Sequence, residues 1–289
     1  MLRRFTNPAN LIRLRLNRLR NKKVNITSLG SCFSGFVVQR LLLRPGLNFA
    51  PRLNSVLHAR SDVAVDLIKG IRPDIKLVES YLKQGNWGNN NEKVQVKGKE
   101  ITFAEFLTNE ILSRYEHGQE FAADTPDLVI VDSLHELITN AYNHREGGWK
   151  VIFGHITFED KEIKDKFNRD FEYIGDLEAH ETCENVLKVY EHFSSRNRNV
   201  KIVFMHFPLL PEYAPKKLFE RDLKLRPFIN ELSGKIPKNR FSQIEIPVSQ
   251  IVPLLDKTYP NYSFQVWNHF YEDTYDYFAD AILKSLSLR

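Results

Sequence analysis

The hydrophobic positions of the chain form short apolar runs, and longer segments with helical spacing separate them. The runs at 24–29, 127–132, 200–206 and 243–247 predict strands. A run such as 127–132 (DLVIVD), apolar on both faces, is typical of a parallel strand covered by helices on either side. The alternation predicts an α/β protein: a three-layer α/β/α sandwich with a mostly parallel sheet.

Apolar residues recur at helical spacing in the segments between these strands. Helices are predicted over 36–43, 102–117, 176–195 and 216–232, the last with an interruption near Pro227, and a final helix ends near Leu286. A further short strand within 54–61 leads into a helix that begins at Asp62. Glycine and asparagine are frequent over 84–99, which predicts a loop or a small hairpin.

The chain has 289 residues, 42% of them hydrophobic, which is enough for one large domain with a full core. No apolar run approaches the roughly 20 residues that span a bilayer, and the basic start is not followed by the apolar stretch of a signal peptide. The 2 cysteines, Cys32 and Cys183, predict free thiols in a reducing, cytoplasmic compartment. The sequence holds no phosphate-binding loop, G-x-G-x-x-G motif or Cys/His metal spacing, so we expect no metal site and no tightly bound cofactor.

Positive charge is concentrated in the first 23 residues. They hold 8 of the 41 Lys and Arg residues and no acid, so the rest of the chain carries 33 basic against 36 acidic side chains, a net charge of −3. We therefore divide the chain into a basic N-terminal arm, 1–23, and an α/β/α domain, 24–289. The arm is either a basic amphipathic segment lying on an anionic membrane or a polyanion, or a helix or linker packed against the domain. Because the domain is mildly acidic, no specific nucleic-acid binding is predicted.

The stretch 24–35 (VNITSLGSCFSG) is the strongest candidate for chemistry. It reads as a strand that passes through a glycine-containing turn into a helix. Glycine allows a sharp turn, and the N–H groups and dipole at a helix start stabilise an anion or a thiolate. The turn therefore holds either a reactive Cys32 or a buried cysteine in an ordinary strand-to-helix connection.

The motif at 29–34 (LGSCFS) resembles the first block of SGNH-type hydrolases and acyltransferases, in particular the GSCFA-like branch with a G-S-C-F-[AS] block. The resemblance implies a flavodoxin-like sheet of the SGNH type. Aligned on Gly30, Ser31 stands at the position of the usual Asp and Cys32 at that of the usual Ser nucleophile. The resemblance thus implies a thiol nucleophile at Cys32, or the hydroxyl of Ser31 or Ser34 in its place.

His269 matches the catalytic His of these families, which lies in a loop just before the last helix. The Asp that usually precedes this His by three residues is absent, because Val266 stands there. The stretch 269–277 is similar to the F-H-Y…D-x-Y-Y ending of the relatives, which adds Tyr271 to the expected site. The alternative is a capping His under aromatic packing.

Other side chains are expected near the nucleophile at the carboxyl ends of the strands, where open α/β sheets bind ligands. The G-x-N that usually supplies an oxyanion donor is missing after the strand at 127–132. Ser133, His135 and Asn140 are the candidate donors in its place. Glu136 matches one member of an acidic pair that the relatives carry at this point.

What the resemblance implies is an acyl-transfer enzyme. The relatives resemble proteins of bacterial surface-polysaccharide (capsule) assembly, so the expected activity is O-acetyltransferase-like transfer to a glycan, with acyl-CoA (acetyl-CoA) as donor. Arg60, in an A-R-S motif shared with relatives, either holds a phosphate or carboxylate of these substrates or lies on the surface. A carboxylesterase or deacetylase of the same fold is one alternative, and a non-catalytic carbohydrate-binding or assembly module with a decayed site is another. The expected location is cytoplasmic, or peripheral at the inner face of a membrane through the arm.

Overall fold

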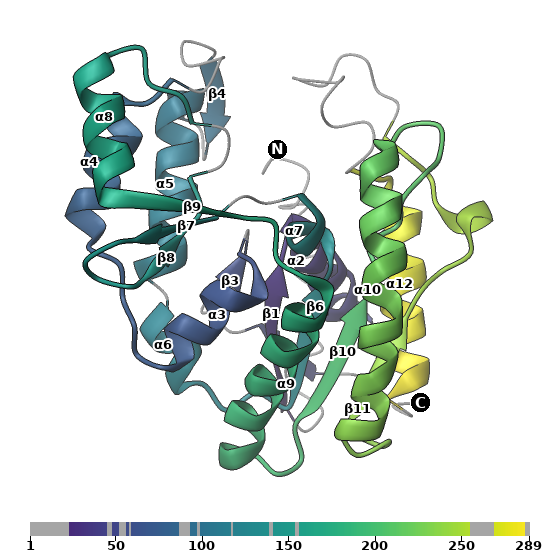
Figure 1. Cartoon of the computed structure of the whole chain (residues 1–289). Helices are drawn as coiled ribbons and strands as arrows, with labels where there is room; N and C mark the ends of the chain where they lie inside the picture. Colours follow the sequence, from purple (N-terminus) through teal and green to yellow (C-terminus); the bar gives the residue numbers. More distant parts are fainter. Residues whose placement is uncertain are drawn as a thin grey trace.

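The structure of the protein is a computed structural model, shown in Figure 1. It describes residues 23–44, 48–51, 56–57, 59–86, 93–96, 99–116, 118–138, 141–153, 156–254 and 269–286. Apart from Lys23, which opens the first strand, the basic arm lies outside these residues, so its contact with a membrane stays a prediction. Among the helices that are described, none is both long and apolar enough to cross a membrane.

A parallel sheet of 6 strands forms the centre of the molecule, in the order β11-β10-β6-β1-β2, with β3 also paired to β1. The strands are β1 (Lys23–Gly30), β2 (Asn48–Pro51), β3 (Val56–Leu57), β6 (Leu128–Asp132), β10 (Lys201–Met205) and β11 (Phe241–Ile244). β6 lies between β1 and β10, and all 5 of its residues are buried, as expected of a strand covered on both faces.

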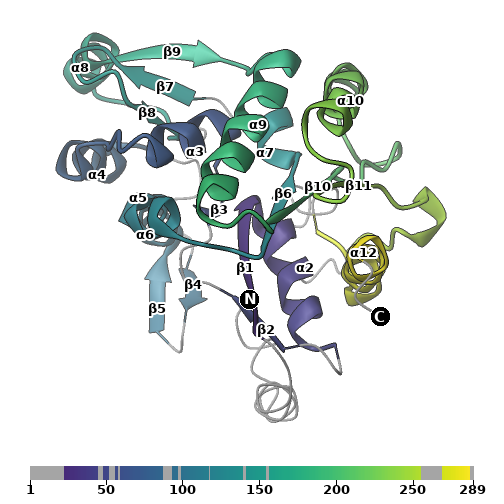
Figure 2. The ribbon, with the colours of Figure 1, turned by 90° about the horizontal axis from the view of Figure 1, so that it is seen from below.

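Helices cover both faces of this sheet, which confirms the predicted three-layer α/β/α sandwich. α2 (Cys32–Leu42) and α12 (Glu272–Ser285) pack against each other on one face. α3 (Ser61–Ile68), α9 (Ala179–Arg196) and α10 (Lys216–Lys235) lie on the opposite face, as Figure 2 shows. Two short helices, α7 (Leu134–Ile138) and η2 (Val248–Gln250), follow β6 and β11.

The remaining elements lie beside the sandwich, most of them at the upper left of Figure 1. They are α4 (Ile75–Gln84), β4 (Lys93–Val96), β5 (Lys99–Thr102), α5 (Phe103–Glu116), α6 (Gly118–Ala123), β7 (Ala141–His144), β8 (Lys150–Val151), α8 (Lys161–Asp170) and β9 (Phe171–Gly175). β4 and β5 form a hairpin, and β8-β7-β9 form an antiparallel sheet that the sequence analysis did not predict. Tyr81 of α4 packs edge-to-face on Phe167 and Phe171, so aromatic contacts join α4 to α8 and β9.

The structure differs from the predicted helices in two places. α2 begins at Cys32 rather than at residue 36, because the Oγ of Ser31 accepts the N–H of Phe33 and caps the helix. α10 continues through Pro227 without the predicted interruption. The carbonyl that loses its helical partner there belongs to Leu223, which is 66% exposed, so water is available as a replacement partner.

The parallel strands of the central sheet end together at one edge. The N–H of Ser133, after β6, donates to Met205 O at the end of β10 (3.2 Å). The N–H of Ala59, after β3, donates to Gly30 O at the end of β1 (3.3 Å). The segments that follow these strands are therefore neighbours, and this carboxyl edge is where open α/β sheets bind ligands.

Candidate active site

A sharp turn at Gly30 carries the chain from β1 into α2. Gly30 has a φ of 134°, a conformation that residues with a side chain rarely adopt. A Cβ at this position would also overlap the carboxylate of Asp132. Glycine is required here for both reasons. Gly30 allows the turn to lie close to the end of β6.

Asp132, the last residue of β6, holds this turn from the neighbouring strand. Its carboxylate accepts the backbone N–H groups of Ser31 (2.7 Å), Ser34 (3.2 Å) and Leu134 (3.0 Å), and also the hydroxyl of Ser31 (3.0 Å). Asp132 is 1% exposed; burial raises the pKa of its carboxyl group, and the surrounding donors oppose that rise. Sequence reasoning missed this residue, although an acid at the end of an otherwise apolar strand is a visible signal.

The hydroxyls of Ser31 and Ser34 are used inside the turn. Both residues are fully buried. Ser31 Oγ caps α2 and contacts Asp132, while Ser34 Oγ donates to Ser31 O (2.9 Å). Both hydroxyls are thus engaged inside the turn, and the predictions of Ser31 as an alternative nucleophile and of Ser34 as a substrate contact stay predictions.

Cys32 and His269 come together from distant parts of the sequence. Cys32 Sγ lies 3.8 Å from His269 Nε2, and both side chains are half-buried. This separation suits a hydrogen bond that involves sulfur. Cys32 is also the first residue of α2, where the helix dipole favours a thiolate. The pair thus has the geometry that a nucleophile and its general base require.

The chain around His269 is pinned to the segment that follows η2. His269 O accepts the N–H of Leu254 (3.0 Å), and the N–H of Tyr271 donates to Val252 O (2.9 Å). Val252 is itself anchored to α12, since its N–H donates to Thr274 Oγ1 (2.8 Å). These hydrogen bonds fix the backbone of His269 against the segment that follows η2, and that segment is in turn fixed to α12. Val266, which stands where these families usually carry the orienting Asp, lies outside the described residues.

An aromatic cluster joins the helix of Cys32 to the helix that follows His269. The ring of Phe33 contacts Phe207, Phe270 and Phe278, with centroid distances of 5.2, 5.8 and 4.9 Å. Phe33 and Phe278 are fully buried. Because Phe33 and Phe270 each directly follow one member of the pair, their contact helps to fix the separation of Cys32 and His269.

Ion pairs reinforce the same junction at the surface. Arg40 of α2 contacts both carboxylate oxygens of Asp276 on α12, at 2.8 and 2.5 Å, and it also reaches Glu272 at 3.0 Å. The hydrogen bonds to Asp276 raise the pKa of Arg40 against the effect of burial. A bidentate Arg–carboxylate pair sets direction as well as distance, so it restricts the rotation of α2 against α12.

Two predicted substrate contacts have structural roles. Ser133 is fully buried, and its Oγ accepts the N–H of Phe207 (2.9 Å), which ties the ends of β6 and β10 together. Arg60 is 1% exposed, pairs with Asp62 (2.7 Å) and donates to Gly175 O (2.6 Å). Sequence position after a strand could not reveal this burial. Both side chains are buried and engaged in contacts within the protein, and the predictions of Ser133 as an oxyanion donor and of Arg60 as a contact of a substrate phosphate stay predictions.

Glu136 of α7 is a buried carboxyl group on the opposite helical layer. It accepts the N–H and hydroxyl of Ser61 (2.6 and 3.1 Å) and the hydroxyl of Thr182 (3.0 Å). Burial raises the pKa of Glu136 to about 7, the negative charge of Asp62 adds to the rise, and the Ser61 N–H opposes it. Glu136 therefore exchanges its proton near neutral pH.

This raised pKa predicts a specific pH dependence of stability. A carboxyl whose folded-state pKa lies above its ordinary value of 4.5 contributes stability below that pH and loses the contribution as pH rises through about 7. Glu136→Gln cannot ionise, so its unfolding free energy relative to the parent should improve by about 3 kcal/mol between pH 4.5 and pH 8. Urea unfolding across this range measures the difference. The exposed Glu220→Gln is the control, and a parallel response in both variants would contradict the assignment.

The other predicted site residues have varied positions. Tyr271 is the N-cap residue of α12 and is 41% exposed, two positions after His269. His135 is half-buried on α7. Asn140 lies outside the described residues, so its part as an oxyanion donor stays a prediction. Within the described part of the chain, no group of three or more His, Cys, Asp and Glu side chains is arranged to hold a metal ion.

Fold and site together define an α/β/α protein with a cysteine–histidine pair beside the carboxyl edge of a parallel sheet. No protein-family model matches the chain, and no curated protein matches it either. Among solved structures, the chain is similar to an acetyl xylan esterase (Est2A) from the rumen bacterium Butyrivibrio proteoclasticus, with 11% identity and a TM-score of 0.36. The match covers 93% of this chain and 65% of that chain. At this TM-score the likeness is distant, so the activity and substrate named for the esterase are statements about that protein.

Proposed function

We propose that the protein is an acyl-transfer enzyme that works through a covalent thioester on Cys32. The observation that carries the proposal is the separation of 3.8 Å between Cys32 Sγ and His269 Nε2, with the thiol in the first turn of α2. A cysteine at a helix start next to a histidine has the surroundings that lower a thiol pKa and activate it as a nucleophile.

The reaction has two halves. His269 Nε2 takes the proton of the Cys32 thiol, and the thiolate attacks the acyl carbonyl. The bond between the carbonyl carbon and the leaving group then breaks, and the imidazolium returns its proton to that group. In the second half, His269 removes a proton from the acceptor hydroxyl, and the acceptor oxygen attacks the thioester carbonyl. The bond from that carbon to Sγ then breaks, and the Cys32 thiolate takes the proton back from the imidazolium. Water as acceptor yields a carboxylic acid, and an alcohol as acceptor yields a new ester.

In this proposal the acceptor is a glycan hydroxyl and the donor is an acyl-CoA such as acetyl-CoA. The support is the resemblance of the 29–34 motif to the G-S-C-F-[AS] block of enzymes linked to surface polysaccharides. Hydrolysis by the same pair is the alternative, and the chemistry up to the thioester is common to both. The N–H groups of Ser31, Phe33 and Ser34 already donate within the turn, so oxyanion stabilisation must come from other donors.

Single-turnover acylation by an activated acetyl ester tests the proposal. Cys32→Ala should reduce acylation to background, and Cys32→Ser should retain a small fraction because a hydroxyl is a weaker nucleophile. His269→Ala should lower the rate by about 10²–10⁴-fold, the usual contribution of a positioned general base. The double variant should be little worse than Cys32→Ala, because the two residues act as one unit.

Ser31→Ala serves as the matched control for a neighbouring residue in the same turn. It should acylate nearly as fast as the parent once allowance is made for any loss of folded protein, measured by circular dichroism. Normal acylation of Cys32→Ala together with a dead Ser31→Ala would assign the chemistry to the hydroxyl. Equal acylation rates in all variants would contradict the proposed enzymatic activity and favour a non-catalytic carbohydrate-binding or assembly module.

A further inference from the structure

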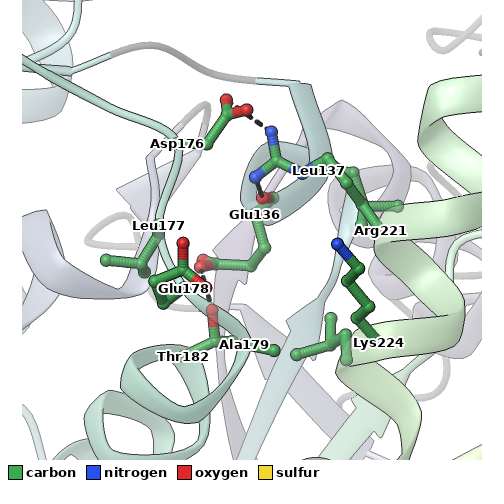
Figure 3. A pocket seen from close by; sticks show the side chains of 10 residues that line it. Glu136, Leu137, Asp176, Leu177, Glu178, Ala179, Thr182, Arg221 and Lys224 are labelled. Carbon is green, nitrogen blue, oxygen red and sulfur yellow. Dashed lines mark hydrogen bonds and ion pairs between the residues drawn. The ribbon is translucent and has the colours of Figure 1, made fainter.

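A separate pocket of about 150 Å³ lies between α7, the start of α9 and α10, as Figure 3 shows. Its walls combine charged and polar side chains with leucines. The lining residues are Glu136, Leu137, Asp176, Leu177, Glu178, Ala179, Thr182, Arg221, Lys224 and Leu225. Pockets for drug-sized ligands are typically about 300–1,000 Å³, so this one has room for a single small ring rather than for a long chain.

Several charged groups of the pocket are held by contacts within the protein. Arg221 pairs with Asp176 and donates from Nη2 to Glu136 O (2.6 Å). Glu178 caps α9 through reciprocal bonds with Glu181. Three carboxyl groups (Glu136, Asp176 and Glu178) and two cations (Arg221 and Lys224) line the pocket, so it has no net positive charge to attract a phosphate or another small anion.

Lys224 brings an ammonium donor to the pocket. Its side chain is exposed and makes no ion pair with any residue that the structure describes. In Figure 3 its ammonium group is directed toward the wall that carries Arg221. Asp176, across the pocket, is 58% exposed and has carboxylate acceptor capacity beyond its pair with Arg221. The pocket therefore offers a charged donor and a charged acceptor on different walls, and Leu177 and Leu225 are among its other lining residues.

We propose that this pocket binds one neutral pyranose unit of the glycan, with sugar hydroxyls bridging Lys224 and the carboxylate walls. A hydroxyl both donates and accepts hydrogen bonds, so the hydroxyls of a pyranose match the exposed ammonium group of Lys224 and the exposed carboxylate of Asp176 in the same pocket. The apolar faces of such a ring match the leucine side chains. The inference rests on the proposed function only for the identity of the sugar as part of the acyl acceptor.

Binding is measured on the full chain with Cys32→Ala, so that no acyl transfer accompanies it. The probes are the methyl pyranosides of glucose, galactose and xylose, with inorganic phosphate and glycine as charged competitors. The readout is the methyl NMR signals of Leu137, Leu177 and Leu225. At least one pyranoside should shift these signals saturably, and phosphate and glycine should not.

Lys224→Ala should weaken that binding roughly tenfold, or about 1.4 kcal/mol, because the variant loses a hydrogen bond from a charged donor. The matched control is Lys217→Ala, which changes an exposed lysine on the same helix that does not line the pocket, and this variant should bind like the parent. Shifts by phosphate or glycine alone, equal binding by Lys224→Ala, or no shift with any pyranoside would overturn the proposal. A pocket that binds sugar in a protein whose Cys32 never acylates would instead refute the proposed enzyme and leave the pocket standing.

Discussion

Asp132→Ala should leave the protein unfolded or barely stable at room temperature. Removing this carboxylate deprives the buried N–H groups of Ser31, Ser34 and Leu134 of their acceptor. Each buried donor without a partner costs about 1–3 kcal/mol, and the sum approaches the whole free energy of unfolding of an ordinary domain, about 5–15 kcal/mol. Urea unfolding followed by circular dichroism measures the loss.

The comparison variant is Asp127→Ala, close to the opposite end of β6. Its carboxylate accepts the N–H of Asn25 (2.9 Å) and the side chain of Asn197 (3.2 Å), in a half-buried position that water can reach. We expect this variant to lose about 1 kcal/mol and to keep the parent rate of Cys32 alkylation. Asp132→Asn should behave more like Asp132→Ala, because both carboxylate oxygens accept N–H groups and an amide nitrogen would face one of them. A stability of Asp132→Ala within 1 kcal/mol of the parent would contradict this account.

Phe33→Ala should cost about 3–5 kcal/mol and also slow the reaction of Cys32. The ring is fully buried and contacts Phe207, Phe270 and Phe278, so its removal leaves a cavity at the junction of α2 and α12. That junction sets the distance between Cys32 and His269. The pH profile of Cys32 alkylation by iodoacetamide should therefore shift toward that of an isolated cysteine, in addition to the loss of stability.

Phe121→Ala separates the two effects. Phe121 is also fully buried, but its ring packs on Phe193 of α9, with ring centroids 5.3 Å apart, and is not among the aromatic rings that contact Phe33. We expect a similar loss of stability and an unchanged pH profile for Cys32. If both variants leave the profile unchanged, the aromatic cluster stabilises the fold without positioning the pair.

The features predicted correctly are those that local pattern encodes. The apolar run of β6, the turn at Gly30 and the position of His269 before the last helix each follow from a few neighbouring residues. The parallel sheet then follows because strands separated by helices are joined by crossover connections. α8 was not predicted, because Ile163 and Phe167 are its only apolar core contacts and its remaining surface is polar.

The features that sequence reasoning missed depend on contacts between distant segments. Asp132 acts on the Cys32 turn from another strand, about a hundred residues away, and nothing in its own neighbourhood reveals that. The backbone hydrogen bonds that join the segment at Val252 to the segment at Tyr271 have no sequence motif that would predict them. For Arg60 and Ser133 the prediction located the correct edge of the sheet but not the burial of the side chains. Burial depends on how α3, β9 and β10 close over that edge, which only the assembled fold determines.

The most direct test of the central claim is to locate the acyl group itself. The parent protein is mixed with an activated acetyl ester, quenched in acid within the first turnover, digested and mapped by mass spectrometry. The account predicts one acetyl group on the peptide that contains Cys32, labile to hydroxylamine as a thioester is, and absent from the same peptide of His269→Ala at the same time point. Acetylation of Ser31 or of another residue, or an unmodified Cys32 in a protein that still turns over the ester, would contradict it.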